Sequence, residues 1–511
     1  MSVGVEEFEV VVVGAGPGGL ASGVTLGSYG VDTLVVERRL SSSTLPRATV
    51  ASTGTMELLR RWGLEQRAWE RSIDVEWQAW ACPTLAAVDD GETVEVGLPT
   101  REQAALVSPT SPACLGQDEL EPLLEEHLGS LASVRLERGV ELVGLEHGRD
   151  GGHVLTLAGP GERRRAIRAR YVIGADGMRS RVREELGITT EGSEKIAERL
   201  GVLFHAPIWN LVREHRYGIY FVTGEPEESS FLPAGEPDRW LFGMPWDTSA
   251  GDVEALTTEQ VKRWIRDAAG DPGLPIEIDR WMTVTFGVGL AERFRAGDAF
   301  LIGDAAHRVS PRGGTGLNTA IRDGFDIGWK LAWVLRGFGG ERLLESYERE
   351  RRPVAEFNTQ RSVRADGSIL GTGLGLSADI GGRIGHVWVP RDGGLVSTLD
   401  LLDGGLTLFV GPDWDGSLPT RDPGSPPVTV QRLDAIAARG LGLTTTGSLL
   451  ARPDGYPVAL WNGDEPGPAR LAGAIAAASG SAPAARVGGS MRRRPSGASH
   501  LRVRSSRAAG H

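Results

Sequence analysis

The residues whose types and spacing are best suited to chemistry lie between positions 297 and 335. A short apolar strand, residues 299–302, ends at Gly303-Asp304, and a loop follows that ends in Gly313-Gly314-Thr315-Gly316. Apolar or small residues then recur with helical spacing, which predicts a helix with one buried face from about Leu317. Unpaired N–H groups and the macrodipole make a helix start favourable for negative charge. The sequence therefore predicts an anion-accepting helix start, with the Asp304 carboxylate placed to accept hydrogen bonds from a sugar-alcohol chain.

A complete β-α-β unit is predicted near the amino terminus, with strands at 8–13 and 31–36 around a helix at 20–29. Gly14 would form the tight turn, Gly16 would let the backbone approach a pyrophosphate, and Gly19 would allow the helix to pack closely on the strand. Glu37, about 20 residues further on, would accept the hydroxyls of an adenosine ribose. Because this acid argues against a 2′-phosphate, the unit favours FAD or NAD over NADP.

The composition excludes several classes of protein. The 511 residues are enough for two or three domains, and the net charge of −12 gives no electrostatic case for nucleic acid or an anionic membrane. Two cysteines, Cys82 and Cys114, indicate neither a disulfide framework nor a thiolate metal site. The acidic start and the lack of a long apolar run predict neither a signal peptide nor a membrane span. We therefore expect a soluble cytoplasmic protein without a bound metal.

A third diagnostic stretch is the strand and turn at residues 171–177, which ends in Asp176-Gly177. Taken together and in their order along the chain, these three stretches resemble those of the class A FAD-dependent aromatic hydroxylases related to para-hydroxybenzoate hydroxylase. The resemblance covers roughly residues 8 to 461. It implies an α/β fold in which a Rossmann-type FAD-binding domain is interleaved with an antiparallel-sheet substrate domain.

The resemblance also implies which residues hold the cofactor. Pro311 and Gly314 would shape the site and position the flavin, and no essential base is identified, because His307 is expected to brace the loop. A nicotinamide cofactor would dock transiently, since no second glycine-rich dinucleotide unit is present. The expected FAD contacts are Gly14, Gly16, Gly19, Glu37, Arg38, Arg47, Gln117, Asp176, Asp304, Gly316, Leu317 and Asn318.

Predicted strands at 201–206, 217–222, 239–244 and 282–288 form a sheet with an apolar-aromatic face. Trp240, Phe242 and Phe286 are the expected substrate contacts on this face, with core packing as the alternative for each of them. The predicted FAD-binding domain comprises residues 1–75, 106–190 and 289–370, and the predicted substrate domain comprises 76–105 and 191–288.

The C-terminal part resembles the small thioredoxin-like domain of polyketide aromatic hydroxylases and is predicted to span residues 380–466. It contains no CxxC motif, so disulfide exchange is not expected. A glycine-rich linker is predicted at 367–385 and a hairpin around Pro453-Asp454-Gly455. Residues 467–511 contain no acid and eight arginines, and apart from a short helix at 471–478 they are expected to be disordered.

These features predict a monooxygenase, monomeric or homodimeric, that uses FAD, NADPH or NADH, and O2. The resemblance implies a C4a-hydroperoxyflavin that hydroxylates a phenolic, polycyclic polyketide-type substrate. A Baeyer–Villiger or epoxidising oxygenase on the same fold is the first alternative, and a flavin oxidase or halogenase is the next. A protein that binds FAD without turnover is the alternative from a different class.

Overall fold

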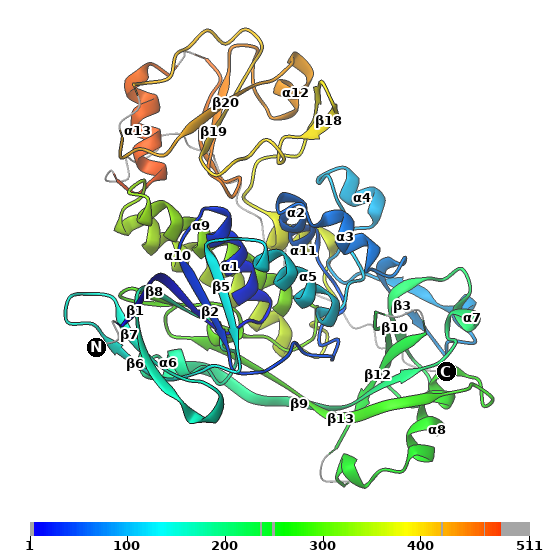
Figure 1. Ribbon diagram of the computed structural model, residues 1–511. Coiled ribbons are helices and arrows are strands. Elements are labelled where there is room, and N and C mark those ends of the chain that lie inside the picture. Colours follow the sequence, from blue (N-terminus) through cyan, green and yellow to red (C-terminus); the bar gives the residue numbers. More distant parts are fainter. Residues whose placement is uncertain (1–4, 236–237, 248–250, 421–422, 464–465, 482–511) are drawn as a thin grey trace, which may run out of the picture.

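The computed structural model describes residues 5–235, 238–247, 251–420, 423–463 and 466–481 (Figure 1). Two eight-stranded sheets and a smaller four-stranded sheet form its framework. None of the described helices is both long enough and apolar enough to cross a bilayer.

The first sheet has the strand order β14-β15-β8-β1-β2-β5, and β6 and β7 continue from β8. Its central strands are parallel, because β1 pairs in this direction with both β2 and β8. Helix α1 follows β1 and joins it to β2, as the predicted β-α-β unit requires. The strands are β1 (Glu6–Val13), β2 (Thr33–Glu37), β5 (Val134–Arg138), β6 (Glu141–His147), β7 (His153–Ala158), β8 (Arg164–Gly174), β14 (Arg295–Ala296) and β15 (Ala299–Leu301).

Helix α9 (Gly316–Leu335) is buried on nearly all sides, so the prediction of a single buried face is wrong. It packs against α1 (Pro17–Ser28) through glycines that allow close approach: a Cβ added to Gly324 would lie 2.3 Å from the Gly18 carbonyl oxygen. Helix α10 (Glu341–Val363) and the C-terminal part enclose the remaining sides (Figure 1). The start of α9 is therefore held rigidly at the carboxyl end of the first sheet.

The second sheet has the order β16-β13-β9-β12-β11-β10-β3-β4, and α8 (Thr258–Ala269) packs on one of its faces. Two strands are much longer than predicted, β9 (Thr190–His205) and β13 (Glu277–Ala291), and they pair with each other along the second sheet (Figure 1). The predicted strands at 201–206 and 282–288 are parts of these two. The polar first half of β9 has no apolar alternation because both its faces are largely exposed. The other strands are β3 (Glu76–Cys82), β4 (Glu92–Val94), β10 (Tyr217–Val222), β11 (Ser229–Pro233), β12 (Arg239–Pro245) and β16 (His307–Arg308).

The C-terminal sheet has the order β20-β19-β21-β22, with β19 parallel to β20 and antiparallel to β21. The predicted hairpin is confirmed by the antiparallel pair of β21 (Ser448–Ala451) and β22 (Pro457–Trp461). The predicted short helix is α13 (Pro468–Ala478), whereas residues 482–511 lie outside the described part. The other two strands of this sheet are β19 (Leu406–Val410) and β20 (Val428–Arg432), and β17 (Trp388–Arg391) and β18 (Gly394–Ser397) form a separate antiparallel pair. The thioredoxin-like character of this part stays a prediction.

Within the predicted linker, residues Thr372–Ile380 form helix α11, so the linker prediction is wrong there. Asp379 of α11 accepts hydrogen bonds from the Ser52 hydroxyl and the Gly54 N–H, both at 2.8 Å. These contacts fix the segment to the start of α2, which neighbouring glycines in sequence could not reveal. The remaining helices are α2 (Thr53–Arg61), α3 (Glu65–Glu70), α4 (Arg101–Ala105), α5 (Gln117–Gly129), α6 (Arg181–Glu185), α7 (Trp209–Val212) and α12 (Ala435–Gly440).

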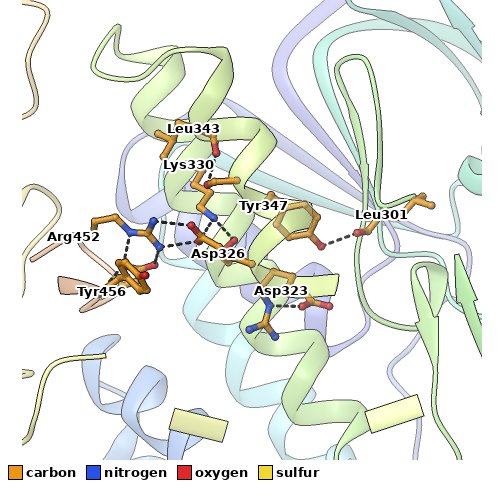
Figure 2. A network of polar contacts seen from close by, with 12 residues as sticks. Leu301, Asp323, Asp326, Lys330, Leu343, Tyr347, Arg452 and Tyr456 are labelled. Atoms are coloured by element: carbon orange, nitrogen blue, oxygen red, sulfur yellow. Dashed lines mark hydrogen bonds and ion pairs between the residues drawn. The ribbon is translucent and has the colours of Figure 1, made fainter. Parts of the chain in front are cut away.

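A buried network of charges joins α9, α10 and the C-terminal part (Figure 2). The Lys330 ammonium donates to Asp326 and Glu350, each at 2.7 Å, and Lys330 is completely buried. Arg452, which follows β21, donates two hydrogen bonds to Glu350 and pairs with Asp454. The carboxylates of Asp326, Glu350 and Asp454 are close enough for a metal site, but Lys330 and Arg452 already supply the positive charge.

Candidate active site

The turn between β1 and α1 has glycines that serve two different needs. A Cβ on Gly14, which has a φ of +107°, would lie 2.3 Å from the Ala175 carbonyl oxygen, and one on Gly19 would lie 1.9 Å from that of Gly14. A Cβ on Gly16 would meet no protein atom within 4 Å. Protein packing therefore requires glycine at 14 and 19, whereas the bare backbone at 16 leaves open space over the helix start, where a phosphate can bind.

The carboxylate of Glu37 lies beside this turn. Its Oε2 accepts from the Ala15 N–H and its Oε1 from the Arg39 N–H, both at 2.9 Å. A carboxylate has about four acceptor positions, so it can still accept from ribose hydroxyls. Arg38 is next to it and exposed.

Asp304 projects from a short turn directly after β15. Its side chain is exposed, yet the surrounding protein is dense enough that burial raises the pKa of its carboxyl group, against the charges of His307, Arg308 and Arg47. Asp304 makes no hydrogen bond to any described residue, which leaves its oxygens available to a ligand. The structure thus brings Arg47, itself exposed, within electrostatic range of Asp304.

The start of α9 presents unpaired donors. The side chain of its N-cap residue, Thr315, accepts no hydrogen bond from the helix. The first main-chain hydrogen bond of the helix runs from the Thr319 N–H to the Thr315 carbonyl oxygen. The N–H groups of Gly316, Leu317 and Asn318 have no acceptor among the described residues. The loop before them turns at Gly314, which has a φ of +62°. The Gly314 N–H donates to the carbonyl oxygen of Pro311 at 3.0 Å, and Pro311 itself is exposed.

The side chain of Asn318 is fully engaged by protein. Its Oδ1 accepts from the Ser52 N–H at 2.8 Å and the Thr55 hydroxyl at 2.7 Å, and its Nδ2 donates to the carbonyls of Val50 and Gly314. Only the main-chain N–H of Asn318 is therefore left for a cofactor, and the side chain instead fixes the two loops on either side of it.

His307 braces the loop, as predicted. It is 1% exposed, and its Nε2 lies 2.5 Å from Asp323 Oδ2, while Arg351 donates to Asp323 Oδ1 at 2.7 Å. Burial alone would raise the pKa of Asp323, but the charges of His307 and Arg351 outweigh it and lower that pKa. The roles of Asp323 and Arg351 in holding His307 were not predicted from the sequence. The available signal was an acid at a buried helical position of α9, which requires a partner.

Two further predicted contacts are engaged locally. Asp176 accepts from the Ser180 hydroxyl and from the Val182 N–H at 3.1 Å, so it caps the start of α6. Burial raises the pKa of Asp176 even though these hydrogen bonds lower it. Gln117, at the start of α5, donates to Glu121 at 2.7 Å.

The two faces of the second sheet are distinguished by β12. Arg239 points toward the first sheet, since it donates to Asp118 of α5 at 3.0 Å. Because side chains alternate along a strand, Trp240 and Phe242 point the other way. They are 0% and 1% exposed in the cluster that packs against α8. The expectation that these two contact substrate is corrected accordingly: their aromatic rings fill the core, the alternative given for them above.

The opposite face contains the third expected contact, Phe286. Register places it with Leu241, Met282 and Val284, which are only partly buried. The guanidinium of Arg312, in the loop before α9, lies 5.8 Å from the centre of the Phe286 ring. This apolar face therefore faces the loop that carries Pro311 and Gly314.

Comparisons with known proteins agree with this geometry. Residues 7–362 match the family model described as FAD binding domain. A tetracenomycin A2 monooxygenase-dioxygenase from Streptomyces glaucescens is 31% identical over 524 residues, covering 88% of this chain and 93% of that protein. An aklavinone 12-hydroxylase from Streptomyces purpurascens is 33% identical, covering 90% and 96% of the two chains.

Among solved structures, a ternary complex of aklavinone-11 hydroxylase with FAD and aklavinone superposes with a TM-score of 0.82 and 28% identity. The match covers 93% of this chain and 99% of that one, so the mixed α/β architecture is shared over nearly the whole length. The exposed carboxylate of Asp304, the bare backbone at Gly16 and the free donors of α9 fit an extended dinucleotide. The chain belongs to the FAD-binding-domain family of flavin-dependent hydroxylases.

Proposed function

We propose that this protein is a monooxygenase that uses FAD, a reduced nicotinamide cofactor and O2 to hydroxylate a phenolic, polycyclic polyketide. The observation that carries the proposal is the convergence of three separated segments, at Gly16, Asp304 and the start of α9, on one extended site. The relatives named for tetracenomycin and aklavinone support a polycyclic substrate.

In this proposal each segment holds a different part of FAD. The N–H groups at the start of α1 bind the pyrophosphate, Glu37 accepts from the adenosine ribose, and Asp304 accepts from the ribityl chain. The free N–H groups of Leu317 and Asn318 would hold the pyrimidine edge of the ring and stabilise the negative charge of its reduced form. When bound and reduced, FAD would supply the chemistry that activates O2, and one oxygen atom of that O2 would enter the product.

The protein's own contribution is to position the substrate and to exclude water. The apolar face formed by Leu241, Met282, Val284 and Phe286 suits one side of a flat polycyclic ring. The loop at Pro311 and Gly314 closes the other side and keeps the rings at a fixed separation. His307 holds this loop through Asp323 and is too deeply buried to serve as a general base for the substrate.

The test is product identification by mass spectrometry after incubation of the purified protein with NADPH or NADH, 18O2 and a panel of phenolic polyketides. Hydroxylation predicts one labelled oxygen on an intact ring carbon, whereas a Baeyer–Villiger reaction would insert it between two carbons. Reductant consumption that is stimulated by the phenol is expected of an enzyme. A product without label would contradict the monooxygenase proposal, and no consumption with any phenol would favour a non-catalytic flavoprotein.

A further inference from the structure

A small cavity lined by several arginines lies beside the start of α9. Its volume is about 50 Å³, and its walls come from the loop before α9, from α10 and from α11. One buried water needs roughly 10–15 Å³, and a cavity of about 150 Å³ holds benzene. This cavity therefore has room for a few waters or one small ion, but not for an aromatic substrate.

Three guanidinium groups line the cavity, those of Arg322, Arg351 and Arg361. Arg351 is neutralised by Asp323, at 2.7 Å. Asp379, which also lines the cavity, acts on Arg322 by its charge alone, and burial nevertheless lowers the pKa of that guanidinium. Glu57 also acts on Arg322 by its charge, so Arg322 and Arg351 both have carboxylates nearby.

The unbalanced cation is Arg361. Within the described chain it has no carboxylate at ion-pair distance, and burial lowers its pKa with no opposing charge. Its Nε donates to the Gly367 carbonyl at 2.7 Å, which fixes the guanidinium against the loop: a Cβ on Gly313 would lie 2.6 Å from its Cζ. The positive end of α9 adds to the same potential. A single negative charge would complete the site.

Asn358 provides an independent observation. It lines the cavity, is 4% exposed, and donates through Nδ2 to the Thr319 hydroxyl at 3.1 Å. Its Oδ1 is buried and has no donor among the described residues. A buried acceptor without a partner is costly, so a group in the cavity should donate to it.

We propose that this cavity binds a small monovalent oxyanion that also carries a hydroxyl group, of the chemical class of bicarbonate. Its charged oxygens accept from Arg322 and Arg361, and its hydroxyl donates to Asn358 Oδ1. Formate and nitrate match the charge but cannot donate, so they bind more weakly. Gly314 and Asn318 also line this cavity, so it adjoins the flavin site proposed above, but anion binding there requires neither reductant nor substrate.

The test uses the purified FAD-loaded protein and sodium bicarbonate, with sodium gluconate keeping the ionic strength constant because its anion is too large for the cavity. A ligand that binds only the folded state raises stability in proportion to RT ln(1 + [L]/Kd). The urea midpoint, followed by tryptophan fluorescence, should rise with bicarbonate and half-saturate at a lower concentration than with formate. A midpoint that does not respond to bicarbonate would overturn the proposal.

Variants locate the effect. Arg361→Gln should abolish the bicarbonate response, whereas Arg364→Gln, in which an exposed arginine paired with Asp366 is changed, should keep it. Asn358→Leu should remove the difference between bicarbonate and formate. An Arg361→Gln protein that responds like the wild type would place the anion elsewhere and refute the site.

A second measurement does not depend on any variant folding. Crystals of the wild-type protein soaked in sodium bromide should show an anomalous peak between Arg322 and Arg361, because bromide carries the required charge and is small enough to enter. Bromide peaks confined to the molecular surface would overturn the proposal.

Discussion

Replacing Asp304 with alanine is expected to weaken FAD binding without weakening the apoprotein. The carboxylate makes no hydrogen bond to any described residue, so its removal leaves no protein group without a partner. Burial raises the pKa of Asp304, which means that its charged form is less stable in the folded protein than in the unfolded chain. The apoprotein should therefore unfold at the same urea concentration as the wild type or a slightly higher one.

The loss in FAD affinity follows from the hydrogen bonds proposed for the ribityl chain. A hydrogen bond to a charged group contributes about 1.5–3 kcal/mol. Since about 1.4 kcal/mol corresponds to tenfold in affinity, each lost bond should raise the Kd for FAD roughly 10- to 100-fold. The protein should then purify colourless or nearly so.

The assay is fluorescence titration of FAD with apoprotein, accompanied by urea unfolding of both apoproteins. Asp392→Ala, which removes an exposed acid in the β17–β18 turn, is the matched control and should bind FAD as the wild type does. A variant at position 304 that keeps full yellow flavin occupancy and an unchanged Kd would refute the placement of the ribityl chain. A variant whose apoprotein is strongly destabilised would refute the reading of Asp304 as a ligand-facing group.

Three other substitutions give distinct outcomes. Lys330→Met leaves buried carboxylates without their shared cation, and it should destabilise the protein by about 3–5 kcal/mol in urea unfolding; a neutral effect would contradict the network. Burial would raise the pKa of Glu350, but Arg452 and Lys330 lower it to about 2. Its contribution to stability is thus present above its unfolded pKa of about 4.3 and is lost as the pH falls toward 2, so Glu350→Gln should flatten the acid limb of the stability profile. Phe286→Ala should raise the Kd for a phenolic ligand roughly tenfold at unchanged FAD content, whereas Trp240→Ala should cost about 3–5 kcal/mol of stability; the reverse pattern would exchange the two faces of the sheet.

The glycine turns and the acid after β2 could be predicted because their constraints are local. A positive φ at Gly14 and a helix start at Gly16 depend on neighbouring residues, and the spacing to Glu37 is fixed by one helix and one strand. The same locality explains the correct hairpin around Asp454. The prediction of a linker at residues 367–385 was wrong for the opposite reason. Helix α11 is stabilised by contacts with the start of α2, more than three hundred positions away in the chain.

The sequence by itself determined the cofactor class, the order of the three motif-bearing stretches and the helix that begins near Leu317, because each is encoded in a short run of residues. The placement of the flavin ring at that helix start stays a proposal. Tertiary structure alone decided which face of the second sheet lies against the loop at Pro311 and Gly314. Alternation assigns Trp240 and Phe286 each to a face of its own strand, but only strand register and the position of α8 determine which face is core. It also decided which charges are balanced: Arg351 pairs with Asp323, whereas Arg361 has no acid at ion-pair distance among the described residues, because electrostatic pairing depends on distance in space and not along the chain.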